Sequence, residues 1–266
     1  MITQPYNFHT HTYRCHHASG DIADYCQAAT KLGLQTLGFS DHTPLPDNRW
    51  PKVRMQISDL ADYCQKIDAA KLDFPQLNIF QGLECEYDSD YQNFFREVLL
   101  QEFQMDYLIG SVHWFPQNST WINAWKADNS VKNLLAYSHY IIRLMQSGIF
   151  AFIAHPDLFA AFYLNDDANS RACSRDILAA AAQLNIPLEI NGYGFQKKEI
   201  ITPQGKRKMY PWEPFWELAQ DYQIKVIANS DAHKPANVYG CIDQARALAE
   251  KYGLQLVDEN EIVGRK

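Results

Sequence analysis

The sequence has no long apolar run, no paired cysteines and no basic N-terminal segment followed by an apolar one. Without an apolar stretch of about 18 or more residues, we expect no membrane-spanning helix, and the N-terminus does not resemble a secretion signal. The six cysteines are scattered, with no C-x-x-C pair, which is typical of reduced thiols rather than of a disulfide framework. We therefore predict a cytoplasmic protein.

The sequence also lacks an excess of positive charge. Its net charge of −7 argues against a long nucleic acid as a partner and leaves the oligomeric state open. The 266 residues, of which 47% are hydrophobic, suffice for two ordinary domains or for one α/β barrel. Because there is no linker or low-complexity stretch, we predict a single domain over residues 1–266.

Histidines and acids recur at the ends of apolar, strand-like segments. They are His9, His11 and the nearby His17, then Asp41, His42, Glu84, His113, His155, Asp231 and His233. Two histidines spaced as H-x-H on a strand point to the same face, and the carboxyl ends of parallel barrel strands meet at one mouth. A single such histidine is more often a hydrogen-bonded core or rim residue. The whole set favours one polynuclear centre for zinc, iron or manganese.

Three other residues near these segments have open or unrelated roles. His139 lies within a predicted helix and has no expected role at the site. His16 stands beside His17 and stays ambiguous. Cys15 lies inside the first histidine-rich segment, where it is either a small packing residue or a group that approaches the site.

Seven strand-like segments alternate with helical patterns, which favours a parallel sheet with right-handed crossovers. The predicted strands are 6–11, 36–42, 78–84, 107–113, 150–155, 186–191 and 224–233, and the predicted helices are 21–32, 57–72, 91–103, 131–146, 174–184, 213–222 and 237–252. Two long loops, 114–130 and 192–212, interrupt the pattern. The first contains Trp121 and Trp125, which either form an aromatic wall or pack the loop onto the barrel. The second contains Lys197 and Lys198, which either attract phosphate or are merely solvated.

The order of these motifs resembles the PHP (polymerase and histidinol phosphatase) family. The motifs are H-x-H, a third histidine six residues later, and then S-D-H, G-L-E, G-S-V-H, A-H-P-D and S-D-A-H. Within that family, segments 11–18, 40–46, 110–114 and 230–235 are similar to histidinol-phosphate phosphatases. The resemblance implies an α/β fold, a distorted TIM-like (β/α)7 barrel, with three divalent metal ions (Zn, Fe or Mn) at the C-terminal strand ends.

The resemblance also implies a set of ligands for each ion. The first ion would be bound by His9, His11, Glu84 and Asp231; the second by Glu84, as a bridge, with His113 and His155; the third by His17, His42 and His233. Asp41 and Asp157 would hydrogen-bond neighbouring imidazoles and orient them.

The implied activity is metal-dependent hydrolysis of a small phosphomonoester, L-histidinol phosphate, in histidine biosynthesis. A hydroxide bridging two ions would be the nucleophile. The expected catalytic residues are Glu84, Asp231, His42 and Asp41, and the expected substrate-binding residues are Arg54, Lys197, Lys198 and Trp121. Arg54 has a second interpretation, as a surface residue.

Two positions depart from the family pattern and leave the substrate open. Gln196 stands where an arginine is usual, and Phe159–Ala161 stands where basic residues are usual. The alternatives are a PHP-type phosphodiesterase, exonuclease or nucleotide phosphatase, and a non-catalytic PHP module.

Overall fold

The computed structural model describes residues 2–263 of the chain. These residues form two compact units, each built from separate segments of sequence. The first unit contains the residues up to Ile109, then Asn229–Asp243 and the residues from Glu259. The second contains Gly110–Ala228 and Gln244–Asp258.

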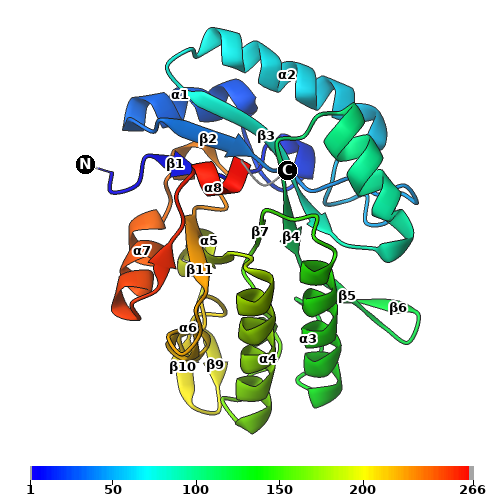
Figure 1. Cartoon of the computed structure of the whole chain (residues 1–266), viewed down its shortest axis with the longest axis vertical. Helices are drawn as coiled ribbons and strands as arrows, with labels where there is room; N and C mark the ends of the chain where they lie inside the picture. The colour runs from blue at the N-terminus through cyan, green and yellow to red at the C-terminus, as the bar shows by residue number, and fades with distance from the viewer. Residues whose placement is uncertain (1, 264–266) are drawn as a thin grey trace. The chain divides into compact units, whose positions relative to one another are not determined.

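Parallel strands form the centre of the first unit. β1 (Tyr6–Asn7), β2 (Thr36–Phe39), β3 (Asn78–Glu86) and the start of β4 (Tyr107–Ser111) follow one another in this order, and the β1–β2 and β2–β3 pairs are parallel. Helices α1 (Ile22–Leu32) and α2 (Leu60–Asp73) lie against these strands (Figure 1). Asp21 caps α1 with a capping box, and Gly33 ends it with a φ of 83°, as the sequence predicts.

The remaining elements of the first unit are short. They are the 3₁₀ turns η1 (Tyr13–Cys15), η2 (Ile57–Asp59), η3 (Ser89–Tyr91) and η6 (Pro235–Asn237), the π-helix η4 (Phe94–Glu102) and the helix α8 (Asn260–Val263).

The second unit repeats the strand–helix pattern. The end of β4 is followed in the sheet by β7 (Phe152–Ile153), β8 (Leu188–Asn191), β11 (Lys225–Asn229) and β12 (Gln255–Leu256), and the β7–β8 and β11–β12 pairs are parallel. Its helical elements are α3 (Val131–Gln146), α4 (Ala168–Leu184), α5 (Gly192–Gln196), α6 (Glu213–Ala219), most of α7 (Ile242–Lys251) and the 3₁₀ turn η5 (Leu158–Ala161). α3 and α4 run side by side (Figure 1).

All seven predicted strands and all seven predicted helices are present, whereas β12 was not predicted. The prediction of two plain loops is wrong, because each contains an antiparallel hairpin. These are β5 (Trp114–Gln117) with β6 (Thr120–Asn123), and β9 (Ile200–Thr202) with β10 (Gly205–Arg207). Asn118 and Ser119 connect the first hairpin with positive φ angles of 47° and 61°, as a tight two-residue hairpin turn requires.

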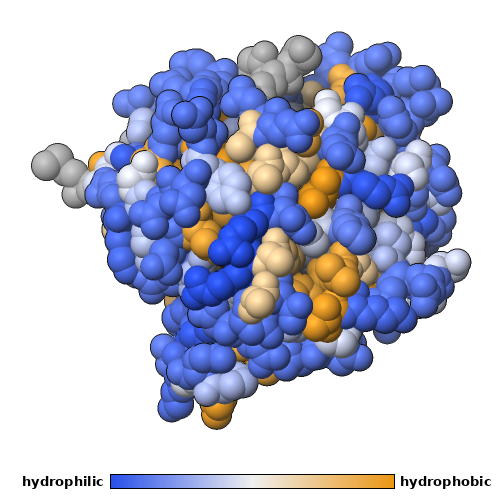
Figure 2. All heavy atoms as spheres, turned by 60° about the horizontal axis from the view of Figure 1, so that its bottom comes forward, coloured by the Kyte–Doolittle hydropathy of each residue, from blue (hydrophilic) through white to orange (hydrophobic). Residues whose placement is uncertain are grey.

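The described helices include none that is long and apolar enough to cross a membrane. On the face drawn in Figure 2, hydrophilic residues predominate and hydrophobic residues gather in a few groups.

Tyr107 ties together the strands of the first unit. Its hydroxyl donates to the carbonyl oxygens of Phe8 (2.8 Å) and Phe39 (3.0 Å), just beyond β1 and at the end of β2. Glycine leaves room for the phenol ring: a Cβ on Gly38 would lie 2.3 Å from the Tyr107 hydroxyl, and a Cβ on Gly82 would lie 2.6 Å from the ring. The hydroxyl therefore satisfies buried carbonyl groups at the strand ends that hold the histidine and acidic side chains.

We expect Tyr107→Phe to lower the free energy of unfolding by about 1–3 kcal/mol, because it leaves buried carbonyl oxygens without their donor. Urea denaturation measures this loss. Tyr13→Phe is the matched control, since Tyr13 is 50% exposed and should change stability little. Equal stability of the two variants would show that the hydroxyl has no structural role.

Candidate metal centre

Backbone pairing places the His9–His11 segment beside the Asp231–His233 segment. Thr10 and Ala232 form a parallel bridge. His11 N–H donates to the carbonyl of Ala232 (2.9 Å), and Ala232 N–H donates to the carbonyl of His9 (3.2 Å). The side chains that flank Thr10 and Ala232 are thus brought together, although they are more than 200 residues apart in sequence.

A second pairing places His42 beside Glu84. The two residues form a parallel bridge, Glu84 N–H donates to the carbonyl of Asp41 (3.1 Å) and Thr43 N–H donates to that of Glu84 (2.9 Å). The N–H of Ser40 donates in turn to the carbonyl of Thr10 (3.0 Å). The C-terminal ends of β1, β2 and β3 therefore hold their histidine and acidic side chains in adjacent register.

Four side chains of the first unit bring their donor atoms to one point. The Nε2 atoms of His9 and His11 are 3.1 Å apart. Both lie 3.4 Å from Oε2 of Glu84, and they lie 3.5 and 3.1 Å from Oδ1 of Asp231. Donors bound to one ion at about 2.0–2.2 Å in a tetrahedron are about 3.3–3.6 Å apart. The spacing and the donor types therefore suit a zinc-like ion.

Three further imidazoles form a second group in the same unit. His17, His42 and His233 place ring nitrogens within 4.8 Å of one another. Nδ1 of His17 lies 2.6 Å from the carbonyl oxygen of Cys15, and Nδ1 of His233 lies 3.0 Å from that of Asp231. An Nδ1–H bonded to a carbonyl leaves Nε2 with its lone pair, which is the form that binds a metal. Of the two adjacent histidines, His17 joins this group.

The protonation of the buried groups also suits a metal. Burial by itself would raise the pKa of Asp231, but the imidazoles of His9, His11 and His233 outweigh burial and hold that pKa well below its usual range. Burial, together with His11, lowers the pKa of His233 to about 3. Asp231 is therefore an anion and His233 a neutral imidazole near pH 7, the forms that bind metal ions.

His113 and His155 lie together in the second unit, where they follow β4 and β7. Their ring centroids are 4.8 Å apart. The backbone N–H of His155 donates to Oε2 of Glu189 in β8 (3.2 Å), and the same oxygen accepts from the side-chain amide of Asn191 (2.8 Å). Each of the nine predicted metal-binding residues thus lies beside at least one other of them within its own unit.

Asp41 and Asp157, predicted to orient imidazoles, make hydrogen bonds of a different kind. Both carboxylate oxygens of Asp41 accept from Thr12, from its N–H at 2.9 Å and its hydroxyl at 2.8 Å, which fixes the turn after His11. Oδ2 of Asp157 accepts from Trp212 N–H (2.5 Å) and Trp216 Nε1 (2.9 Å). Burial raises the pKa of Asp157 to about 6. Both carboxylates hold the chain around the histidines.

Arg54 is buried, with 1% of its surface exposed, so its interpretation as a surface residue is wrong. Its Nη1 donates to the carbonyl of Thr43 (2.7 Å) and its Nη2 to Oε2 of Glu86 (2.8 Å), which forms an internal ion pair. These contacts join the segment after β2 to the end of β3. A direct role of Arg54 with phosphate stays a prediction.

The two tryptophans of the first predicted loop, Trp121 and Trp125, contact different parts of the second unit. The ring of Trp121 contacts Tyr140 on α3, with centroids 5.6 Å apart. The ring of Trp125 instead contacts Tyr210 (5.7 Å), and Tyr210 contacts the ring of His155 (5.7 Å). Trp125 is 41% exposed. The exposed ring of Trp125 is therefore connected to His155 through the buried ring of Tyr210, whereas the ring of Trp121 contacts α3.

Cationic residues approach the same region. Nζ of Lys197 lies 3.9 Å from the centroid of Tyr193 and 5.5 Å from that of Trp125, whereas Lys198 is exposed. Nη2 of Arg207 donates to the carbonyl of Ala160 (2.8 Å), in the segment where the family usually has basic residues.

The sequence interpretation missed Tyr210, which lies in the stretch predicted as a loop. Gly194 makes the approach of Tyr210 possible, since a Cβ on Gly194 would lie 2.3 Å from the carbonyl oxygen of Tyr210.

Parallel strands with imidazole and carboxylate groups at their ends define a metal-binding α/β protein. The sequence model of the PHP domain matches residues 7–192. The chain belongs to the PHP domain family, as its motifs predict.

Proteins named as histidinol-phosphatases are similar in sequence to most of this chain. A Deinococcus radiodurans protein named "Probable histidinol-phosphatase" is 30% identical over 238 residues, which cover 86% of each chain. The histidinol-phosphatase of Bacillus subtilis is 27% identical over 259 residues, covering 86% of this chain and 94% of the relative.

A solved structure has a similar fold. Histidinol phosphate phosphatase (HISK) of Lactococcus lactis, in complex with Zn, L-histidinol and phosphate, has a TM-score of 0.75 and 18% identity. The match covers 96% of this chain and 95% of that chain. This likeness confirms the predicted fold class, a distorted TIM-like α/β barrel.

We expect removal of metal to destabilise the protein. Chelation should lower the melting temperature, because the buried carboxylates of Glu84 and Asp231 would then lose their bound cation, and a ligand at 100 times its Kd stabilises a fold by about 2.7 kcal/mol. Thermal denaturation before and after dialysis against a chelator measures the effect.

Added zinc or manganese should restore the melting temperature. Calcium is the control, because it prefers oxygen-rich sites and should restore little. Identical melting curves with and without metal would contradict the assignment of these residues as ligands.

Proposed function

We propose that this protein is a metal-dependent phosphomonoester hydrolase, and that its substrate is L-histidinol phosphate. The observation that carries the proposal is the convergence of His9, His11, Glu84 and Asp231, whose donor atoms lie 3.1–3.5 Å apart in a buried site. The names of the relatives and the zinc, L-histidinol and phosphate in the Lactococcus lactis structure support this choice of reaction and substrate.

The donor groups support a centre of three ions. We assign them as the family resemblance implies: one ion to His9, His11, Glu84 and Asp231; one to Glu84, His113 and His155; and one to His17, His42 and His233. Zinc, iron and manganese all suit imidazole and carboxylate donors. The PHP match runs through segments of both units, which supports one catalytic domain over residues 1–266. The scattered cysteines favour action in the cytoplasm.

Glu84 has the most central position among these residues. Its Oε2 lies 3.4 Å from the Nε2 atoms of His9 and His11 and 3.0 Å from Nδ1 of His42. One carboxylate oxygen thus faces imidazoles assigned to the first and to the third ion, a central position that suits a carboxylate shared between ions. Divalent ions bound there would lower the pKa of water and neutralise the phosphoryl oxygens. Burial of Glu84 and Asp231 limits competing water and strengthens these electrostatic effects.

The second unit offers a surface for the organic part of the substrate. L-Histidinol phosphate has an aromatic imidazole and an ammonium group, and both bind well to aromatic faces. The exposed ring of Trp125 offers such a face, and the buried ring of Tyr210 lies between it and His155. Lys197 adds a positive charge, so we assign it to the phosphate, with Lys198 and Arg54 as further candidates.

We expect Glu84→Gln to lower kcat by at least about 100-fold, the loss typical when one preorganised charged group is removed from an active site. Phosphate release from L-histidinol phosphate by zinc- or manganese-loaded protein measures it. His139→Ala is the control, because His139 is exposed on α3.

Near-normal turnover of the Glu84→Gln protein, with its metal content intact, would contradict the role of Glu84. A nucleoside 3′,5′-bisphosphate and an aryl phosphate should be tested in parallel. Preference for the bisphosphate would favour the alternative, a PHP-type nucleotide phosphatase or exonuclease.

We expect Trp125→Ala to raise KM for L-histidinol phosphate by about 3- to 10-fold, the energy of one aromatic contact, with a smaller effect on an aryl phosphate that lacks the ammonium group. Trp121→Ala is the matched control, since its ring contacts Tyr140 on α3. A larger effect at Trp121 than at Trp125 would reverse the assignment of the aromatic surface.

A further inference from the structure

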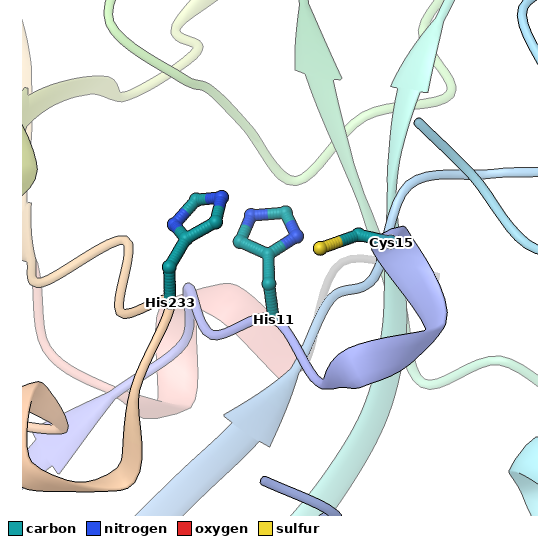
Figure 3. Close-up of side chains that lie close together, drawn as sticks. All are labelled: His11, Cys15 and His233. Carbon is teal, nitrogen blue, oxygen red and sulfur yellow. The ribbon is translucent and has the colours of Figure 1, made fainter. Parts of the chain in front are cut away.

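Cys15 lies among the histidines of the first unit. It ends η1, it is fully buried, and its sulfur lies within 4.8 Å of ring nitrogens of His11 and His233. Figure 3 shows the imidazole of His11 between the Cys15 thiol and the His233 ring. These three side chains form a compact set of possible metal donors. His11 and His233 are expected ligands, whereas Cys15 is not among the nine.

The two ring nitrogens of His11 have different surroundings. Its Nε2 faces Asp231 (3.1 Å) and Glu84 (3.4 Å). Its Nδ1 is buried and has no hydrogen-bond partner among residues 2–263. A ring nitrogen of His11 points toward the sulfur of Cys15 (Figure 3). A buried, unpartnered nitrogen is costly unless a ligand satisfies it.

The turn that contains Cys15 suits a sulfur anion that is bound to a cation. The sulfur of Cys15 accepts hydrogen bonds from the backbone N–H groups of His17 and Ala18. His16, with a φ of 64°, makes the tight turn that brings them there. Backbone N–H groups arranged in this way around an anion are a common feature of ion-binding turns. A bound cation would supply the remaining stabilisation of the thiolate.

The imidazole of His233 is also oriented so that it can bind a cation. Its Nδ1 is engaged by the carbonyl oxygen of Asp231 (3.0 Å), which leaves Nε2 as the donor atom. Sulfur and imidazole together are a preferred ligand set for zinc.

We propose that Cys15 is a thiolate ligand of the metal centre and binds the ion at His233, with Nδ1 of His11 as the neighbouring donor. Binding releases the thiol proton to solvent. His11 would bind the two ions through one ring nitrogen each, as an imidazolate, so its ring proton is released to solvent together with the thiol proton. A thiolate in the set favours zinc or iron over manganese, because manganese prefers oxygen ligands. This inference rests on the proposed metal centre but not on the proposed substrate.

Cobalt substitution tests the proposal without an activity assay. The protein loaded with Co²⁺ should show a sulfur-to-cobalt charge-transfer band in the near-ultraviolet. We expect the band to disappear in Cys15→Ser and to persist in Cys26→Ser, a matched control because Cys26 is also fully buried, on α1. Visible cobalt absorption should remain in both variants, since the imidazole and carboxylate sites still bind the ion.

X-ray absorption of the zinc-loaded wild-type protein gives the same answer if Cys15→Ser does not fold. It should show a sulfur neighbour at about 2.3 Å beside the nitrogen and oxygen neighbours at about 2.0–2.1 Å. Bound cobalt or zinc without any sulfur neighbour would overturn the role of Cys15 and leave the proposed function standing. Failure to bind either metal would overturn the metal centre and this inference together.

Discussion

The pairing of the His9–His11 segment with the Asp231–His233 segment is the constraint on which the rest of the first unit depends. Two backbone hydrogen bonds and the bridge between Thr10 and Ala232 hold the segments in register. A shift of one residue would turn both histidines to the opposite face, since side chains alternate along a strand. Asn7 reinforces this register, because its side chain bonds both the hydroxyl (2.8 Å) and the N–H (3.1 Å) of Ser230.

This constraint explains why so many ionisable groups can be buried together. A buried carboxylate is costly unless charge or hydrogen bonds compensate it. Neighbouring imidazoles provide such compensation for Glu84 and Asp231. Asp231 itself has a φ of 49°, a conformation that a folded site must hold in place. The buried carboxylates and the strained backbone of Asp231 thus lower the stability of the fold, and a bound cation would offset this cost.

The sequence predicted much of this because its signals were local. Strand length, the capping residues of α1 and the spacing of His9, His11 and His17 can all be read without knowledge of tertiary contacts. The contacts of Tyr210 could not be predicted, because they depend on the close approach of Gly194 and on a hairpin with no Asn-Gly turn. The internal ion pair of Arg54 could not be predicted either, because its partner, Glu86, is 32 residues away in sequence and is brought close only by the fold. Cys15 could be noticed in the motif, but only the turn at His16 shows where its sulfur lies.

The proposed function depends on the binding of metal ions by these side chains at the C-terminal ends of the strands. Anomalous diffraction from zinc-soaked crystals, recorded on both sides of the zinc absorption edge, tests it most directly. We expect strong anomalous peaks about 2.0–2.2 Å from the donor atoms of His9, His11, Glu84 and Asp231, and at the same distance from those of His17, His42 and His233. Zinc that is bound only at surface sites, with no peak among these residues, would contradict it.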